Sequence, residues 1–231
     1  AYFMSLNRGK ESIALNLKKD NDKKIFKKIL TKADVLVENF KPGTLEKWGF
    51  GWKEITKKYP RLIYASASGF GQTGPLKELP AYDMVVQGMG GLMSVTGQPN
   101  SEPTRVGTSI GDITAGLFTA IGINAALYDR QKTGKGMFID VSMLDCQIAI
   151  LENAIARYLS KNEIPEPMGS RHPSIAPFEA FKTKDSYIII AAGNDKLFEK
   201  LCNVLRLPEI NQNAKFNSNS TRAKNIDELK I

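Results

Sequence analysis

One carboxylate, that of Asp112, stands at the head of a small and apolar stretch, VGTSIGDITAGLFTAIGINAAL, which spans residues 106–127. The stretch predicts a long helix over residues 113–130, with Asp112 where the helix begins. Asp commonly caps a helix there, because its side-chain oxygen accepts a backbone N–H and its charge meets the positive end of the helix dipole. Alternatively, the carboxylate reacts with a substrate that reaches it past Gly111 and Gly116. The stretch alone favours the cap, since capping carboxylates are far commoner than catalytic ones.

The familiar groupings of catalytic and metal-binding residues are scarce in the rest of the sequence. His172 is the only histidine, so a Ser/His/Asp triad would have to be built on it, and no neighbouring motif supports one. Asp140 and Asp145 stand five residues apart, and Asp145 is expected to cap a second helix. Metal sites need several His, Cys or clustered carboxylate ligands, so we predict none. The loop GFGQTGP (69–75) departs from the dinucleotide motif G-x-G-x-x-G, because Pro75 follows its third glycine.

Positive charge is concentrated at the N-terminal end of the chain. The net charge is +8, and residues 1–61 hold 15 lysines and arginines against 7 acidic residues. A basic lobe favours a polyanionic partner, either nucleic acid or a small phosphorylated cofactor. A solvated lysine-rich face explains the charge equally well. Nucleic acid has no further support, because the sequence shows no recognition motif and no interleaving of aromatic and basic residues.

Cysteine usage and apolar runs bear on the cellular environment. Cys146 and Cys202 fall in apolar helical patterns without metal-ligand spacing, so we expect buried free thiols and a cytoplasmic protein. No apolar run of 18 or more residues indicates a membrane span, and the start lacks the pattern of a signal peptide. Because the chain begins without Met and ends within a helical pattern, we expect it to be a piece of a longer polypeptide.

Strand and helix patterns alternate in the first part of the chain. A hydrophobic content of 42% is enough for a sizeable core, and this alternation is the signature of a parallel sheet covered by helices. The expected strands are 12–17, 34–40, 61–68 and 137–143, and the expected helices are 20–33, with an Asp/Asn cap, 52–59, 113–130 and 144–160.

The pattern changes after the proline-rich stretch 162–177, which we interpret as a linker or an active-site loop. A hairpin is expected next, with its turn at Lys184-Asp185-Ser186, followed by a helix over 195–205. We therefore predict an α/β fold divided into a large domain over 1–161, the linker at 162–177 and the start of a smaller α+β domain over 178–231.

Six blocks follow one another in the order and spacing of a known family: SLNRGKESIALNL, DVLVENFKPGTLEKWGF, LIYASASGFGQTGP, AYDMVVQGMGGLMSVTG, GTSIGDITAGL and RQKTGKGMFIDVSMLD. Over nearly its whole length the chain resembles the family III CoA-transferases of the CaiB/BaiF type. The stretch GSRHPSIAPFEAFKTKD resembles the dicarboxylate branch most. The resemblance implies a Rossmann-like parallel sheet with flanking helices, and a missing segment at each end of this chain. The implied activity is transfer of CoA between an acyl-CoA, such as succinyl-CoA, and a carboxylic or dicarboxylic acid.

The resemblance also implies roles for individual residues. Gly111-Asp112 and Gly116 match the family's G-D-x-x-x-G segment, which makes Asp112 the nucleophile. Such a carboxylate attacks the thioester and passes through an aspartyl anhydride and an aspartyl-CoA thioester, with CoA as a substrate and no tightly bound cofactor. The implied CoA-binding residues include an Asn-Phe-x-Pro-Gly turn, which lies against the nucleotide: Asn39, Phe40, Lys41, Pro42 and Gly43. Lys47 stands where a basic residue approaches a CoA phosphate, and Lys10 lies in the N-terminal block that flanks the adenine.

Two further sites are implied to lie near the substrate. The related 2-methylacyl-CoA racemases carry a His-Asp pair where this chain has Tyr82-Asp83. Tyr is a poor substitute for His as an acid or base near neutral pH, which favours transfer over racemisation. Gly169 and His172 lie where the family has a mobile glycine-rich active-site loop, although GSRHP (169–173) has a single glycine.

The partners implied by the resemblance are an acyl-CoA, a small carboxylic acid and, for the complete protein, a second copy in an interlocked homodimer. Arg105, Arg171 and His172 are candidates to meet the far carboxylate of a dicarboxylic acid. Three alternatives stay open at this point: a racemase-like enzyme, a catalytically inactive CoA-binding fragment and, on charge alone, a nucleic-acid binder. We expect neither a nucleic-acid nor a membrane partner.

Overall fold

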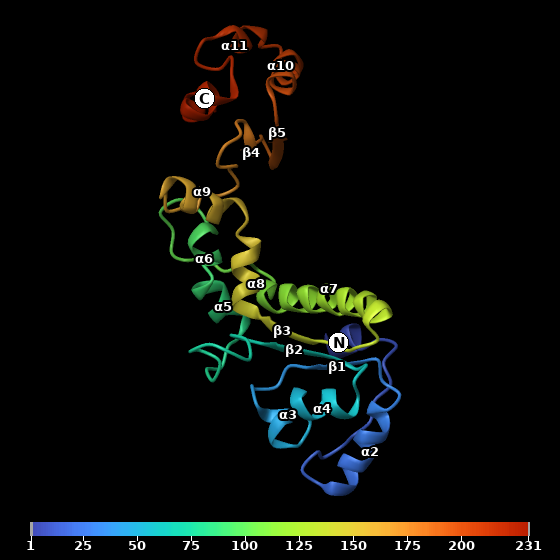
Figure 1. Cartoon of the computed structure of the whole chain (residues 1–231). Coiled ribbons are helices and arrows are strands. Elements are labelled where there is room, and N and C mark those ends of the chain that lie inside the picture. The colour runs from blue at the N-terminus through green and yellow to red at the C-terminus, as the bar shows by residue number, and fades with distance from the viewer. Residues whose placement is uncertain (1, 231) are drawn as a thin grey trace. The chain divides into compact units, whose positions relative to one another are not determined.

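The computed structural model describes residues 2–230, which divide into two compact units. The first, here called the sheet unit, comprises residues 2–92 and 106–152. The second, the hairpin unit, comprises residues 93–105 and 153–230. Each unit has a hydrophobic core of its own. Figure 1 follows the chain through both.

The sheet unit is built on three parallel strands in sequential order: β1 (Val35–Glu38), β2 (Ile63–Ser68) and β3 (Phe138–Ser142). The central strand β2 is buried along nearly its whole length, as expected for a strand covered on both faces. Parallel neighbours are joined by crossovers, and these crossovers place helices over the sheet. Since all three strands run in one direction, their carboxyl ends meet at one edge.

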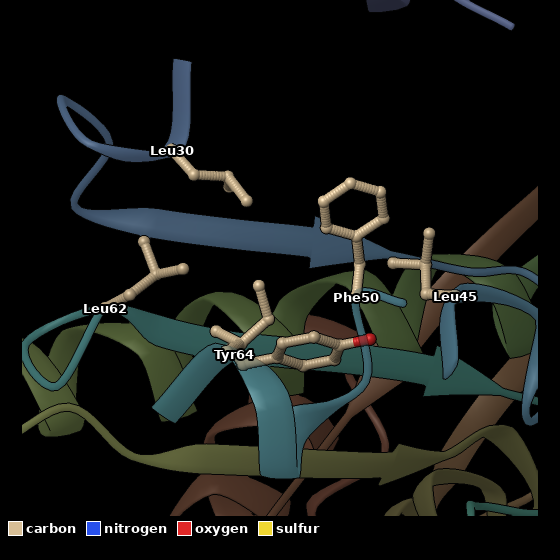
Figure 2. Packing of buried hydrophobic residues seen from close by; sticks show 6 residues of the cluster. Leu30, Leu45, Phe50, Leu62 and Tyr64 are labelled. Atoms are coloured by element: carbon tan, nitrogen blue, oxygen red, sulfur yellow. The ribbon is translucent and has the colours of Figure 1, made fainter. Parts of the chain in front are cut away.

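Three helices cover one face of the sheet: α2 (Asp20–Leu30), α3 (Thr44–Lys47) and α4 (Trp52–Lys58) (Figure 1). The core beneath them consists of Leu30, Leu45, Phe50, Ile55, Leu62 and Tyr64 (Figure 2). Phe26 packs edge-on against Phe50 with ring centroids 4.8 Å apart, an arrangement that aromatic pairs prefer. Burying each large apolar side chain of this cluster contributes about 1.5–3 kcal/mol of folding free energy.

The opposite face is covered by α7 (Ile110–Thr133), with α8 (Met143–Ile150) and α5 (Asp83–Met89) packed beside it (Figure 1). Ala115 of α7, Val141 of β3 and Cys146 of α8 form the core of this layer. Small residues let the helix approach the sheet closely. At Gly122, for example, an added Cβ would lie 3.0 Å from Ile139 Cγ2.

The outer face of α7 is apolar and exposed at Ile113, Leu117 and Ile121. By length and mean hydropathy, α7 is the one helix within residues 2–230 that could cross a membrane. The core helix of a water-soluble protein passes the same test. The absence of a membrane partner therefore stays a prediction.

The hairpin unit contains one antiparallel strand pair and several short helices. Phe178 pairs with Ala191 and Lys182 with Tyr187. The unit's core consists of Ala192, Phe198, Cys202 and Phe216. Its elements are α9 (Asn153–Lys161), β4 (Phe178–Lys182), β5 (Tyr187–Ala191), α10 (Asp195–Val204), α11 (Pro208–Gln212), α12 (Asn219–Lys224) and α13 (Ile226–Leu229). Two short helices complete the chain, α1 (Tyr2–Leu6) in the sheet unit and α6 (Leu92–Val95) where the sequence passes between the units.

The α/β fold class is confirmed, and so is the hairpin with its turn at residues 183–186. Two predicted elements are wrong. Residues 12–17 form no strand, because a strand needs a hydrogen-bonded neighbour and none pairs with this segment in the described chain. The helix predicted over 144–160 is two helices, interrupted at Glu152 with φ of 42°. The division into domains at 161 and 178 stays a prediction.

All three predicted acidic caps are wrong, for one shared reason: each Asp lies inside the first turn rather than before it. Helix α7 begins at Ile110, so its N-cap residue is Ser109 and not Asp112. Helix α8 is capped by Ser142, whose Oγ accepts the backbone N–H of Asp145 at 3.2 Å. The N-cap residue of α2 is Lys19, and Asp20 is already helical.

Candidate active site

Asp112 lies in the first turn of α7 and lines a cavity of about 640 Å³. The cavity extends from α7 to the carboxyl end of β1, where Asn39 leaves the sheet. Open α/β sheets bind their ligands at this edge, outside the carboxyl ends of the strands. The remaining lining is largely apolar: Val37, Glu38, Ala67, Ala115, Gly116, Thr119, Ala120, Ile123 and Met143.

The surroundings of Asp112 raise the pKa of its carboxyl group above the ordinary Asp value. The main cause is partial removal of water by the surrounding protein, and the second is the negative charge of Asp83. Both disfavour the ionised form. Asp112 is nevertheless exposed and lines the cavity, so a reactant can reach it. A carboxylate of raised pKa is a stronger base, and hence a better nucleophile, than an ordinary Asp.

Asp83, the first residue of α5, secures the residue that precedes Asp112. Its Oδ1 accepts the backbone N–H of Gly111 at 2.8 Å. Its Oδ2 accepts the side-chain amide of Gln87, one helical turn further along α5, also at 2.8 Å. The Oε1 of Gln87 in turn accepts the backbone N–H of Val106 at 2.9 Å. Two side chains of α5 thereby hold both ends of the segment 106–111 that leads to Asp112.

The two glycines that flank Asp112 serve different purposes. A Cβ on Gly111 would lie 2.7 Å from Val86 Cγ2 and 3.1 Å from Asp83 Oδ1, so its missing side chain makes room for α5. A Cβ on Gly116 would meet no described atom within 4 Å, and Gly116 lines the cavity. The sequence-based expectation of space for a substrate therefore applies to Gly116, while Gly111 permits close packing.

A second buried glutamine supports α7 from α8. Gln147 is fully buried and donates its side-chain amide to Thr114 Oγ1 at 3.0 Å. Thr114 also donates to the carbonyl of Ile110 at 2.7 Å, which closes the first turn of α7. Gln147 Oε1 is buried without a hydrogen-bond partner among residues 2–230. The first turn of α7 is thus held from α5 on one side and α8 on the other.

Neither Gln87 nor Gln147 was identified from the sequence. The spacing of Gln87 four residues after Asp83 is a usable signal, because such residues are neighbours on a helix surface. Burial of a glutamine, in contrast, has no clear sequence signature. Tyr82 precedes α5 and its side chain is 79% exposed, so within the sheet unit the phenol lies at the surface while Asp83 points to Gly111.

The proposed CoA-binding turn follows β1 directly. Gly43 has φ of 78°, a left-handed conformation that glycine adopts without strain, and α3 starts after it. Phe40 donates its backbone N–H to Glu38 Oε2 and packs against Trp48, with ring centroids 5.5 Å apart. Asn39 and Gly43 line cavities at the end of β1.

The lysines assigned to CoA are all exposed. Lys41 Nζ lies 3.5 Å from Glu78 Oε2, an exposed ion pair of the kind that contributes little to stability. Lys47 is the last residue of α3 and therefore stays close to the Asn39–Gly43 turn. Lys10 follows α1 and donates from Nζ to Asn7 Oδ1 at 3.1 Å. Pro42 lies within the turn itself, half-buried.

Gly169 and His172 belong to the hairpin unit, where the loop 169–173 is tied down by hydrogen bonds. Gly169 has φ of 63° and donates its N–H to the Gly97 carbonyl at 2.8 Å. His172 Nδ1 accepts the backbone N–H groups of Ser174 and Ile175 at 3.2 and 3.1 Å. A contact between this loop and Asp112 stays a prediction, as does the role of His172 with a substrate.

The two arginines proposed for a distant carboxylate differ in their surroundings. Arg171 donates from its terminal nitrogen to the Ala223 carbonyl at 3.0 Å, and its Nε is buried without a partner in the described chain. Arg105 is exposed.

Both cysteines are free and buried, and burial raises the pKa of the Cys146 and Cys202 thiols. Within residues 2–230, no three His, Cys, Asp or Glu side chains gather in a way that could hold a metal ion.

Comparison with known proteins relates this geometry to one family. The chain is 50% identical over 230 residues to an acetyl-CoA:oxalate CoA-transferase of Acetobacter aceti, covering 99% of this chain and 59% of the relative. It is 42% identical over 228 residues to the human succinyl-CoA:glutarate CoA-transferase, covering 99% of this chain and 52% of the relative. The chain thus spans little more than half the length of these relatives.

Solved structures agree with the sequence relatives. A CaiB/BaiF family protein from Brucella suis superimposes with a TM-score of 0.84 at 41% identity, covering 99% of this chain and 61% of that one. A Mycobacterium tuberculosis protein gives a TM-score of 0.86 at 29% identity, covering 97% of this chain and 59% of that one. The profile described as CoA-transferase family III matches residues 1–231. The chain therefore belongs to CoA-transferase family III, the CaiB/BaiF family.

Proposed function

We propose that this chain carries the nucleophile of an enzyme that transfers CoA from an acyl-CoA thioester to a free carboxylic acid, and that Asp112 is this nucleophile. One observation carries the proposal: the Asp112 carboxylate faces a cavity that reaches Asn39, the first residue of the turn assigned to CoA. A thioester bound along the end of β1 would have its carbonyl within this cavity. The names of the relatives point to a dicarboxylic acceptor such as oxalate or glutarate.

The chemistry requires four exchanges at one carboxylate. Asp112 attacks the thioester carbonyl, the carbon–sulfur bond breaks, and a mixed anhydride forms as the CoA thiolate leaves. The thiolate attacks the aspartyl carbonyl of the anhydride and releases the first acid as its carboxylate. The acceptor carboxylate attacks the resulting aspartyl-CoA thioester and expels the thiolate again. The thiolate finally attacks the acceptor's carbonyl, which frees Asp112 and yields the new acyl-CoA. One anion enters and one leaves at every step.

The residues around Asp112 suit this role. The largely apolar lining suits an anhydride, which water would hydrolyse, because it offers few groups that hold water by hydrogen bonds. Partial desolvation makes the carboxylate more basic. The exposed Lys41 lies within the Asn39–Gly43 turn and the exposed Lys47 lies at the end of the following helix α3, and both supply positive charge for a CoA phosphate. Homodimerisation and a cytoplasmic location remain part of the proposal for the complete protein.

The test is chemical trapping in the complete protein. We expect incubation with acetyl-CoA or succinyl-CoA and hydroxylamine to leave a hydroxamate on Asp112, found by mass spectrometry of the peptide that contains it. Asp112→Ala should leave no hydroxamate and should lower transfer to oxalate or glutarate on the order of 10⁴-fold or more, as expected when a covalent nucleophile is removed. Bound CoA should still protect this variant from proteolysis.

Asp145 provides a matched control. It lies in the first turn of α8 as Asp112 does in α7, and it lines another cavity together with Asp140. Asp145→Ala should keep the hydroxamate on Asp112, whereas a hydroxamate on Asp140 or Asp145 would contradict the assignment. Exchange of the substrate's α-hydrogen with D₂O, without transfer, would indicate a racemase instead.

A further inference from the structure

Gln87 is one of the few polar side chains in the sheet unit with no exposed surface. Its amide spans the space between two other groups. Nε2 donates to Asp83 Oδ2 at 2.8 Å, and Oε1 accepts the backbone N–H of Val106 at 2.9 Å. Burying an amide without hydrogen-bond partners costs about 1–3 kcal/mol. The two partners of Gln87 offset this cost and so allow a glutamine at a fully buried position.

The orientation of this amide is fixed by the chemistry of its partners. A backbone N–H can only donate, so it must face Oε1, and the Asp83 carboxylate can only accept when ionised, so it must face Nε2. An ionised glutamate in this place would put two acceptors against one another. A leucine or methionine would remove the hydrogen bond that the N–H of Val106 donates to Gln87.

The segment held by this arrangement is the one that delivers the nucleophile. Val106 N–H binds Gln87 at one end, and Gly111 N–H binds Asp83 at the other, so both ends of residues 106–111 are fixed to the same helix α5. Asp112 is the next residue. A misplacement of about 1 Å at a reacting group can cost on the order of 100-fold in rate.

We propose that Gln87 is a positioning residue for the transfer reaction: through Asp83 and Val106 it fixes the entry segment 106–111 and thereby the place of Asp112. The inference rests on the proposed function, since it assumes that Asp112 reacts. Gln87 has no exposed surface with which to contact a substrate. Its removal should slow the chemical step more than it weakens binding of the acyl-CoA.

A double variant that combines Asp83→Asn with Gln87→Glu tests the proposal. The new amide on the first residue of α5 would accept from Gly111 N–H and donate to the new carboxylate one turn later, which would accept from Val106 N–H. All three hydrogen bonds are then restored, and the donor and the acceptor are exchanged only in the bond between the side chains at positions 83 and 87. Each single variant breaks the hydrogen bond between positions 83 and 87. Asp83→Asn places two amide donors against one another, and an ionised Gln87→Glu places two acceptors against one another. The effect of Gln87→Glu should therefore change sign with the residue at position 83.

The measurement is the single-turnover rate of hydroxamate formation on Asp112 in the complete protein, with succinyl-CoA as the donor. In the wild-type background, Gln87→Glu should slow this rate by about 10- to 100-fold. In the Asp83→Asn background it should accelerate the reaction, while the affinity for CoA changes by less than about threefold in all variants. If Gln87→Glu slows both backgrounds alike, the positioning role is refuted.

A second variant tests the positioning role without placing a charge in the core, which could prevent folding. Gln87→Met keeps the volume and adds no buried charge, so the protein should fold and still lose at least about tenfold in acylation rate at unchanged CoA affinity. If Gln87→Met forms the hydroxamate on Asp112 at the wild-type rate, the inference is wrong. The comparison variant is Gln147→Leu, which removes one hydrogen bond to Thr114 while that hydroxyl keeps its bond to Ile110. It should lower stability but slow acylation much less than Gln87→Met.

The two proposals fail in different ways. If the wild-type protein forms no hydroxamate on Asp112, the proposed function is wrong, and Gln87 is no longer in question. If the hydroxamate forms normally in the wild type and equally fast in Gln87→Met, only the positioning role is wrong.

Discussion

Two side chains without exposed surface, Gln87 in the sheet unit and Arg222 in the hairpin unit, hold their surroundings in different ways. Arg222 donates from Nε to the Ala176 carbonyl and from a terminal nitrogen to the Phe216 carbonyl. Its other terminal nitrogen lies 2.6 Å from Asp195 Oδ1, and its guanidinium stacks 4.3 Å from the ring centre of Phe198. Arg222 thus joins the segment before β4, the turn before α12 and the start of α10.

Among residues 2–230, the side chain of Gln87 makes two hydrogen bonds, one to Val106 of the entry segment and one to Asp83, which itself binds Gly111 of that segment. The contrast teaches that burial of a polar group does not by itself indicate its role. What matters is the segments on which its hydrogen bonds end. The bonds of Arg222 end on structural segments of the hairpin unit, so its loss should affect folding. The bonds of Gln87 end on Val106, at the start of the entry segment, and on Asp83, which binds Gly111 at its end, so its loss should affect rate.

The largest effect on stability is expected from Arg222→Met. Removing the guanidinium leaves two buried carbonyls without their partner, at a cost of about 1–3 kcal/mol each. Asp195 also loses its partner, but its side chain is exposed, so its charge stays solvated. Denaturant unfolding of the complete protein measures this loss in free energy. Lys224→Met on the same helix α12 is the matched control, because Lys224 is exposed and should change stability by less than about 0.5 kcal/mol. Equal effects of the two would contradict the structural role of Arg222.

Arg222 also shows where sequence analysis fails. The segment STRAKN has the polar composition of a solvated helix, and no local pattern signals that one arginine is buried. Its burial depends on carbonyls 46 and 6 residues away, which only the folded chain brings together. For Gln87 the four-residue spacing to Asp83 hints at a contact, but Val106 lies 19 residues away.

The elements that the sequence did predict depend on local patterns. The three strands of the sheet and the long helix α7 follow from apolar runs and spacing, and the hairpin follows from two runs around a polar turn. The segment 12–17 has an alternating pattern as well, yet a strand also requires a partner, which a local pattern cannot supply. The interruption at Glu152 falls in a continuous helical pattern, ILENAIARYL, and has no breaker residue. The identity of Asp112 as nucleophile came from the resemblance, because a carboxylate at a helix start is by itself ambiguous.

A smaller effect on stability is expected when each of the two glycines near Asp112 is replaced by alanine. The comparison tests the role of the entry segment without altering Gln87. Gly111→Ala places a Cβ 2.7 Å from Val86 Cγ2, and we expect a destabilisation of about 1–3 kcal/mol together with slower acylation of Asp112. Gly116→Ala meets no described atom within 4 Å, so it should stabilise α7 by about 0.5–1 kcal/mol. Thermal unfolding and the hydroxamate rate distinguish the two. A Gly111→Ala protein with full stability and full rate would show that α5 does not constrain Asp112.

The smallest effect on stability is expected from removing the charge of Asp112. Arg222 has a carboxylate partner, so its charge stabilises the fold, whereas the ionised Asp112 is partly desolvated and lies near the like charge of Asp83. Because the pKa of Asp112 is raised in the folded state, the folded protein holds this proton to a higher pH than the unfolded chain does. Ionisation of Asp112 is therefore destabilising at neutral pH, and Asp112→Asn should increase the free energy of unfolding there. The gain should shrink as the pH falls through the raised pKa and vanish below the ordinary Asp value of about 3.9, where both states are protonated.

Salt separates the two causes of this gain. Added salt screens the repulsion from Asp83 but leaves the desolvation of Asp112 unchanged, and desolvation is the larger cause. The stabilisation by Asp112→Asn at neutral pH should thus decrease only in part between low and high ionic strength, as followed by denaturant unfolding at each salt concentration. A gain that persists unchanged at a pH of about 3, below the ordinary Asp pKa, would show that Asp112→Asn acts through packing rather than charge. A loss of stability at neutral pH would show that the carboxylate stabilises the first turn of α7, as a helix-dipole partner does.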